Sequence, residues 1–215
     1  MKSYFKYEIQ RYLESECIKQ KQTREWLNKP IKNTELLKIA LLYAQRFSGL
    51  IVSHPSDNSF GNNGGVHEGR ISTKNGMSGS PTLSEILQVQ RDIAVLEYTG
   101  GHLHIPFISS SQSLELIRKA KKQGLNISCS VALANLLFTD EQLNDFDTSY
   151  KLDPPLRTEN DQTALRQGLI DGTIDMVTSN HEPLNLELKH LEFEYAASGT
   201  IGLEAMFGVL STLFP

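Results

Sequence analysis

The sequence predicts an α/β fold built around parallel strands. Short apolar segments that are typical of strands lie near residues 50–54, 102–108, 126–131 and 174–179, with a helix-like segment between each pair. Such alternation indicates parallel strands joined by right-handed crossover helices. Because these segments are apolar rather than alternating, we expect both of their faces to be covered. Four strands are too few for an eight-stranded barrel, so they predict half of one or a small open α/β sheet.

Helices are predicted between and after the strands. The first, residues 33–49, has Asn33 or Thr34 as its cap and is ended by Gly49. Its predicted buried face consists of Leu36, Leu37, Ala40, Leu41 and Ala44. The other predicted helices span residues 81–100, 111–124, 139–146, 159–172, 192–199 and 202–214.

The beginning of the chain has a different composition. Residues 1–29 are polar and helix-prone, with a partial apolar stripe at helical spacing, and Pro30 ends this segment. The sequence therefore predicts an N-terminal helical extension, residues 1–29, ahead of a half-barrel, residues 30–215. We expect the extension to cover an open edge of the half-barrel.

Composition excludes several classes of protein. The 215 residues carry a formal net charge of −4 with a pI near 5.9, which argues against nucleic-acid binding. No stretch approaches the roughly 20 apolar residues of a membrane span, and the first residues lack a signal core, so a cytoplasmic location is expected. Cys17 and Cys129 form no paired motif and are expected to be reduced, with Cys129 in the core.

A long segment rich in Gly, Asn and Ser, residues 55–80, follows the first strand. It reads either as a flexible linker or as a long functional loop at a strand end, and the second interpretation is favoured. Its glycines match neither phosphate-binding spacing, so no phosphate role is predicted.

Several motifs resemble one enzyme family. They include "GSPTLSEILQVQRDIAVLEYTGGHLHI", "LLFTDEQLNDF" and "EFEYAASGTIGLE", and the most specific are "PPLRT" followed by "DGTID". From about residue 30 onward the chain resembles dihydroorotase of the long, zinc-dependent type, of the amidohydrolase superfamily, and in particular a divergent Bacteroidetes-type branch. The resemblance implies a partial TIM barrel, about strands five to eight. The family's earlier strands carry a His-x-His metal pair, a substrate-binding Arg and a modified Lys, whereas the first histidine here is His54.

The resemblance assigns metal-site positions to residues that follow the strands. His54 stands at a metal-binding histidine, although a polar residue that merely forms hydrogen bonds is the alternative. Phe107 stands at another ligand position and cannot bind zinc, whereas the nearby His104 is expected to be a buried or loop-bonded histidine. Ala134 and Asn135 replace a pair of histidines.

Two further positions carry the family's reaction chemistry. Asn180 stands where the family has the aspartate that binds metal and acts as acid and base, and an amide cannot do this. Asp153 replaces an asparagine that faces the substrate amide, and its charge should repel a carboxylate-bearing substrate. Glu182 or Asp57 could act as a stand-in base, although exposed loop acids are the favoured interpretation.

Structural roles are expected for other polar residues. Arg157 is predicted to anchor its loop to a nearby carboxylate. His67 and Glu68 resemble a structural turn of the family.

These observations lead to three functional hypotheses. The first is a dihydroorotase-like protein with a degenerate site, non-catalytic, without a cofactor, and acting as a scaffold or being a fragment. Its expected partners are aspartate carbamoyltransferase, a separate first-half chain or a second copy of itself. The second is a divergent dihydroorotase, a zinc-dependent cyclic-amide hydrolase of pyrimidine biosynthesis, active only in a full-length or assembled form. The third is a small-molecule binding module that uses the loop at 55–80.

Overall fold

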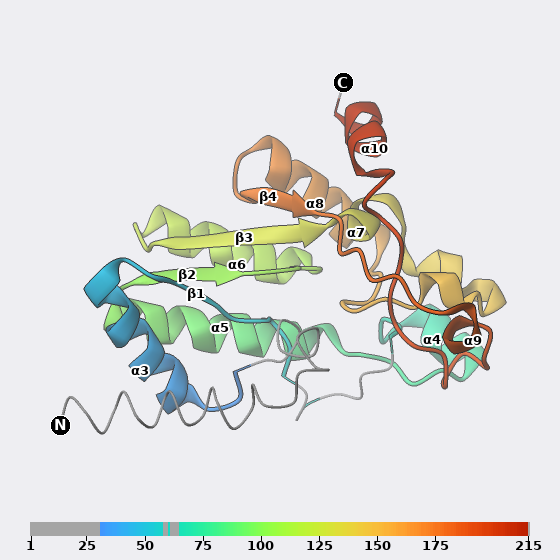
Figure 1. The fold of residues 1–215 in the computed structure, drawn as a ribbon, viewed down its shortest axis with the longest axis horizontal. Coiled ribbons are helices and arrows are strands. Elements are labelled where there is room, and N and C mark those ends of the chain that lie inside the picture. The colour runs from blue at the N-terminus through green and yellow to red at the C-terminus, as the bar shows by residue number, and fades with distance from the viewer. Residues whose placement is uncertain (1–30, 58–59, 61–64, 215) are drawn as a thin grey trace.

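The computed structural model describes residues 31–57, 60 and 65–214 (Figure 1). The predicted helical extension, residues 1–29, lies outside the described residues, as do Cys17 and part of the loop at 55–80. The boundary between the extension and the half-barrel therefore stays a prediction.

Four parallel strands form the centre of the fold. They lie in the sheet in the order in which they occur along the chain, β1-β2-β3-β4 (Figure 1). Their bounds are β1 Leu50–Val52, β2 His102–Ile105, β3 Ile127–Ala132 and β4 Met176–Thr178. The register pairs Val52 with His104, His104 with Ser128, and Ser130 with Met176. The α/β fold with parallel strands in the predicted segments is thus confirmed.

Four helices cover one face of this sheet, each packed against the next in chain order (Figure 1). They are α3 Thr34–Ala44, α5 Thr82–Thr99, α6 Ser111–Lys122 and α8 Glu159–Ile170. Three of them start with a side-chain cap, because Asn33, Ser110 and Thr158 accept hydrogen bonds from backbone amides of the first turn. The predicted buried face of α3 is only partly right, since Leu36 is exposed.

The main core lies between these helices and the sheet. The strands contribute alternate side chains to it, namely Leu103, Ile105, Ile127, Cys129 and Val131. Burial raises the pKa of the Cys129 thiol to about 12, so this cysteine is a protonated packing residue, as predicted.

The other face of the sheet is only partly covered. Ser128 and Ser130 of β3 and His104 of β2 lie on it and bond to one another. Leu50, Val52 and Met176 of the outer strands are 56%, 46% and 48% exposed. The prediction that both faces are covered is therefore wrong for β1 and β4, because no described strand lies opposite them. In a complete barrel, side chains of all eight strands fill this interior.

Shorter elements complete the fold. η1 Gln45–Phe47 joins α3 to the start of β1. The others follow the carboxyl ends of the strands, namely α4 Arg70–Asn75, α7 Leu133–Leu137, η2 Asp140–Asp145, η3 Thr148–Tyr150, α9 Leu186–Lys189 and α10 Met206–Leu213. Figure 1 shows α4, α7 and α9 at the end to which the strands point. Among the described residues, no helix combines the length and the apolar character needed to cross a membrane.

Two helix predictions near the C-terminus need correction. Residues 192–199 form turns and extended chain, not a helix. Their amides bond to other segments, for example from Ala197 to the carbonyl of Leu188 and from Gly199 to that of Lys151. The predicted helix at 202–214 begins only at Met206, because the amides of Gly202 and Leu203 donate to the His181 ring.

Leu103→Ala should destabilise the isolated chain by about 2–5 kcal/mol, because Leu103 is fully buried in the core. Leu50→Ala on the neighbouring strand is the matched control and should change the free energy of unfolding by less than about 0.5 kcal/mol. Urea unfolding measures both. Equal losses for the two variants would contradict the assignment of the core to the helix-covered face.

Candidate functional site

The carboxyl ends of the four strands bring the predicted site residues together, as parallel strands must. His54 follows β1 and is 4% exposed. Neither of its ring nitrogens has a hydrogen-bond partner among the residues that the structure describes. Burial lowers the pKa of His54, and the carboxylates of Asp153 and Glu85 act in the opposite direction. A neutral, buried imidazole without partners is able to bind a metal or a ligand.

Phe107 lies directly beside His54. The two ring centroids are 6.0 Å apart, and the planes are inclined by 51°. The position that the resemblance gives to a second histidine ligand is thus occupied by an apolar ring next to the first. His104 is not available as a substitute, because Nδ1 and Nε2 bond to the hydroxyls of Ser128 and Ser130 at 2.8 and 3.2 Å. His104 is therefore the bonded histidine that was predicted.

Two asparagine side chains that follow β3 and β4 donate hydrogen bonds to loop carbonyls. Asn135 Nδ2 donates to the Pro155 carbonyl at 3.0 Å. Asn180 Nδ2 donates to the Asp153 carbonyl at 3.0 Å, and Asn180 has a left-handed φ of 43°. Asn180 and Asp153 are thus neighbours, and the amide of Asn180 is engaged with the backbone.

A small cavity lies in front of His54. It has a volume of about 60 Å³ and is lined by His54, Ser84, Glu85, Asp153 and Arg157, among others. This volume corresponds to about two water molecules, well below the roughly 300 Å³ of a typical ligand site. Neither Asp57 nor Glu182, the two stand-in acids, is part of its lining.

The residues present do not fit a zinc site. Zinc in proteins needs at least three His, Cys or carboxylate ligands around one point. Among the described residues, no three such side chains are grouped closely enough to hold a metal. His54 could supply one ligand, and Phe107 and Asn180 supply none.

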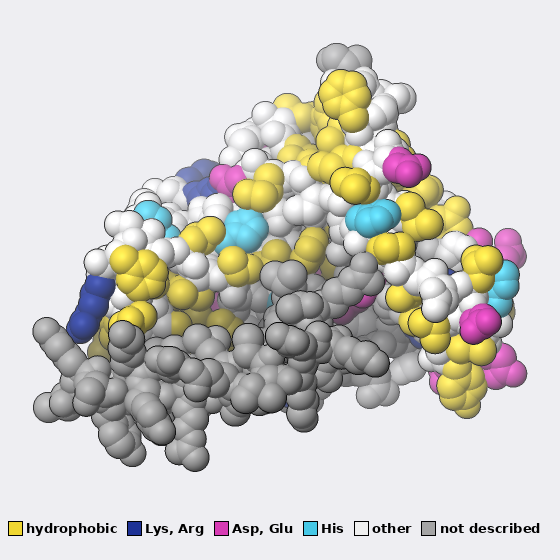
Figure 2. All heavy atoms as spheres, viewed as in Figure 1, with side chains coloured by type: hydrophobic (Ala, Val, Ile, Leu, Met, Phe, Trp, Pro, Cys, Tyr) yellow, Lys and Arg dark blue, Asp and Glu magenta, His cyan; other side chains and the backbone are white. Residues whose placement is uncertain are grey.

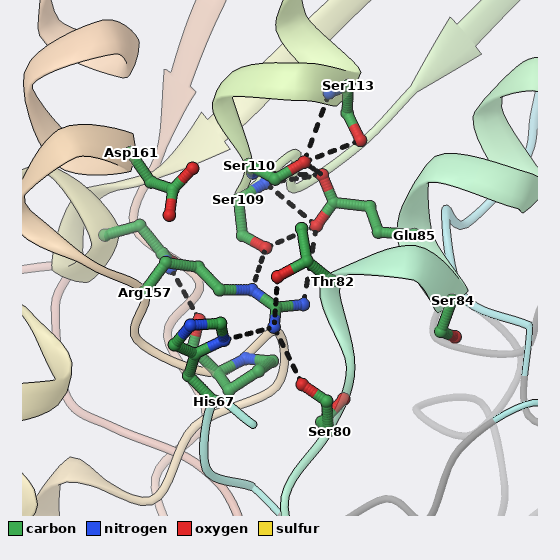
Figure 3. A network of polar contacts seen from close by, with 12 residues as sticks. His67, Ser80, Thr82, Ser84, Glu85, Ser109, Ser110, Ser113, Arg157 and Asp161 are labelled. Carbon is green, nitrogen blue, oxygen red and sulfur yellow. Dashed lines mark hydrogen bonds and ion pairs between the residues drawn. The ribbon is translucent and has the colours of Figure 1, made fainter. Parts of the chain in front are cut away.

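Arg157 forms the centre of a buried polar network behind this cavity (Figure 3). The guanidinium is 4% exposed and lies 3.9 Å from the Glu85 carboxylate. Its Nε donates to Ser109 Oγ at 3.0 Å, and its Nη1 donates to the Ser80 carbonyl at 2.9 Å and to His67 Nδ1 at 3.1 Å. The prediction that Arg157 anchors its loop to a carboxylate is confirmed.

His67 and Glu85 complete this network. Burial and the charge of Arg157 lower the pKa of His67, so its neutral ring accepts a hydrogen bond from the guanidinium through Nδ1. The Glu85 carboxylate accepts from the amides and hydroxyls of Ser109 and Ser110. The hydrogen bonds drawn around Arg157 in Figure 3 thus connect separate loops to one another.

The segment 151–157, "KLDPPLR", bonds to several other loops at this end. At its start, Lys151 Nζ donates to the carbonyls of Phe193 and Glu194 at 2.7 and 3.0 Å. Its middle accepts from Asn180 and Asn135 through the carbonyls of Asp153 and Pro155. Sequence reasoning missed Lys151 and Glu85, because the residue types lysine and glutamate give no local signal that their side chains are buried.

Arg157→Met should cost about 3 kcal/mol or more, because it leaves the Glu85 carboxylate buried without its cation. The double variant Arg157→Met, Glu85→Gln should recover part of this loss. Arg118→Met, at a partly exposed ion pair, is the control and should cost less than about 1 kcal/mol. Chemical unfolding of the three variants is the measurement, and equal losses at positions 157 and 118 would refute the role of the network.

Comparison with known proteins identifies the relatives of this chain. No protein-family model matches it. The dihydroorotase of Syntrophus aciditrophicus is 40% identical over 185 residues, which are 86% of this chain and 43% of that protein. The dihydroorotase of Bacillus subtilis is 38% identical over 184 residues, again 86% of this chain and 43% of that protein. The chain thus spans less than half the length of these relatives.

Two solved structures share the fold of this chain. D-hydantoinase (dihydropyrimidinase) from Thermus sp. has a TM-score of 0.72 at 21% identity, over 85% of this chain and 42% of that one. Dihydroorotase from Saccharomyces cerevisiae, in complex with 5-fluoroorotic acid, has a TM-score of 0.66 at 13% identity, over 85% of this chain and 48% of that one. These matches confirm the partial TIM barrel. The assignment to a Bacteroidetes-type branch stays a prediction. Over 86% of its length the chain is thus similar to dihydroorotases, and it corresponds to less than half of their length.

Proposed function

We propose that this chain is a dihydroorotase-like half-barrel with a degenerate site, which does not open a cyclic amide by itself and serves as a scaffold. The observation that carries this proposal is the chemical type and the hydrogen bond of the Asn180 side chain. Its side chain is an amide, and that amide donates to the Asp153 carbonyl at 3.0 Å.

The chemistry of amide hydrolysis explains why this matters. A water molecule must lose a proton as it attacks the carbonyl carbon, and a group close to that water must accept the proton. An amide side chain has no free proton-accepting nitrogen. The neighbouring Phe107 ring removes a second polar group from the same region. Loss of one acid or base typically lowers the rate by about 10²–10⁴-fold.

The scaffold role rests on the uncovered face of the sheet. Leu50, Val52 and Met176 are half-exposed there. Figure 2 shows further hydrophobic side chains at the surface over the sheet and around α10. We propose that a complementary half-barrel covers this face, supplied by the same polypeptide, by a separate first-half chain or by a second copy. Aspartate carbamoyltransferase as a partner is suggested by the resemblance alone.

A second function is favoured by one observation. His54 is buried with two unpartnered ring nitrogens, which is typical of a ligand whose partners come from elsewhere. In this alternative, the chain is part of a divergent dihydroorotase that becomes active, with zinc, only when a complementary half supplies the missing ligands.

Restoring two ligands tests the degenerate site. The variant Phe107→His, Asn180→Asp should bind zinc at least about tenfold more tightly than the unchanged chain, because it places two more ligand types beside His54. Adding His54→Ala to this variant is the control and should abolish the gain. A competition titration with a zinc-binding dye measures the affinities. Tight zinc binding by the unchanged chain that His54→Ala removes would overturn the proposal.

Association through the uncovered face has its own test. Met176→Lys places a charge on that face and should weaken self-association or pairing with a first-half chain by at least about tenfold. Tyr98→Lys, at an 82% exposed residue of α5, is the control and should have no effect. Sedimentation velocity measures the association of each variant. A dissociation constant of about 100 μM corresponds to an association free energy of about −5.5 kcal/mol. A chain that stays monomeric at about 100 μM would therefore contradict self-association.

A further inference from the structure

A second and larger cavity lies apart from the His54 cavity. It has a volume of about 370 Å³ and is formed by segments 67–71, 139–141 and 158–162. The two cavities share no lining residue, and Arg157, which borders the first, contacts His67 of the second. A volume above about 300 Å³ lies within the range of small-molecule sites.

Two buried polar side chains line this cavity without a partner. Asp140 is 7% exposed and Gln162 is 8% exposed. Apart from the amide of Asp140 itself, no described residue donates a hydrogen bond to the Asp140 carboxylate, and the Gln162 side-chain amide has no partner among the described residues. Buried polar groups are nearly always hydrogen-bonded. The Asp140 carboxylate and the Gln162 amide are therefore available to form hydrogen bonds with a molecule that enters the cavity.

The charges of the lining indicate a cationic ligand. Asp140, Glu141 and Glu159 contribute three carboxylates, against the guanidinium of Arg70. Arg70 is already paired with Glu141. His67 adds no charge, because it accepts a hydrogen bond from Arg157. Among the described residues, the Asp140 and Glu159 carboxylates thus form no direct ion pair, although the charges of Arg70 and Arg157 act on Asp140 from a distance.

The arrangement favours an organic cation over a metal ion. Within the described parts of the chain, no three His, Cys, Asp or Glu side chains are close enough to hold a metal. An ammonium group differs from a metal ion in that it donates several hydrogen bonds and needs only a few acceptors. The Asp140 carboxylate and the Gln162 carbonyl oxygen offer such acceptors, and the Gln162 amide can also donate to a hydroxyl or carbonyl.

We propose that this cavity binds a small organic ammonium compound, with the ammonium group on Asp140 and a polar group at Gln162. The site is separate from the His54 cavity and does not depend on the function proposed above.

Binding of butane-1,4-diamine to the purified chain tests this site. Isothermal titration gives the affinity, and the NMR signals of the Gln162 side-chain amide and the His67 ring give the location. The diamine should bind with a dissociation constant of about 1 mM or tighter, and butane-1,4-diol, its uncharged analogue, should not bind. Asp140→Asn should weaken binding at least about tenfold, because it removes the charge that faces the ammonium group.

Asp145→Asn is the matched control, because Asp145 is an exposed residue of the same element, η2, outside the cavity. It should leave the affinity within about twofold. Melting curves of Asp140→Asn verify that it folds. The proposal fails if the diol binds as well as the diamine, if Mg²⁺ shifts the same NMR signals, or if Asp145→Asn has the same effect as Asp140→Asn. It also fails if nothing binds up to about 20 mM and crystals soaked in the diamine show only ordered water.

Discussion

The segment Lys151–Arg157 is the constraint on which the site end of this fold depends. Loops at the carboxyl ends of parallel strands cannot satisfy their own backbone groups, so something must bond them together. Lys151 binds the tail near Phe193 and Glu194, and the carbonyls of Asp153 and Pro155 bind Asn180 and Asn135. Arg157 then ties these loops to helix α5 through Glu85 and to the turn at Ser80.

The residues that stabilise this end of the fold differ from those to which the resemblance assigns reaction chemistry. The residues around Arg157 bond to one another and connect separate loops (Figure 3). The positions to which the resemblance assigns metal binding and acid–base chemistry hold a phenyl ring at Phe107 and an amide at Asn180. The polar network therefore fixes these loops independently of any metal-ligand set. His54 is the exception, since it is buried and unpartnered.

Much of the fold could be predicted from the sequence because the signals are local. Apolar strand segments, helix caps and glycine stops all act within a few residues, and they place β1–β4 and the helices between them. The resemblance placed His54, Phe107 and Asn180 after three different strands. The rings of His54 and Phe107 do lie side by side, and Asn180 bonds to the Asp153 carbonyl, whereas the roles of these residues in binding or catalysis stay predictions.

Other features depend on contacts between distant residues and left no local signal. Residues 192–199 look helical, but Gly199 bonds to Lys151 and draws the segment into an extended path. The sequence predicted that both faces of the strands are covered, because Leu50, Val52 and Met176 are apolar. An apolar residue type does not show whether another segment packs against it. The burial of Glu85, Asp140 and Gln162 likewise follows from the packing of loops onto helices, which polar residue types do not indicate.

The central claim is that the chain alone cannot activate a water molecule on a cyclic amide. The most direct test is the rate of dihydroorotate ring opening by the purified chain with zinc added, measured against buffer and against His54→Ala. The account predicts the same rate in all three samples. Zinc-dependent ring opening by the purified chain, lost on His54→Ala, would contradict it.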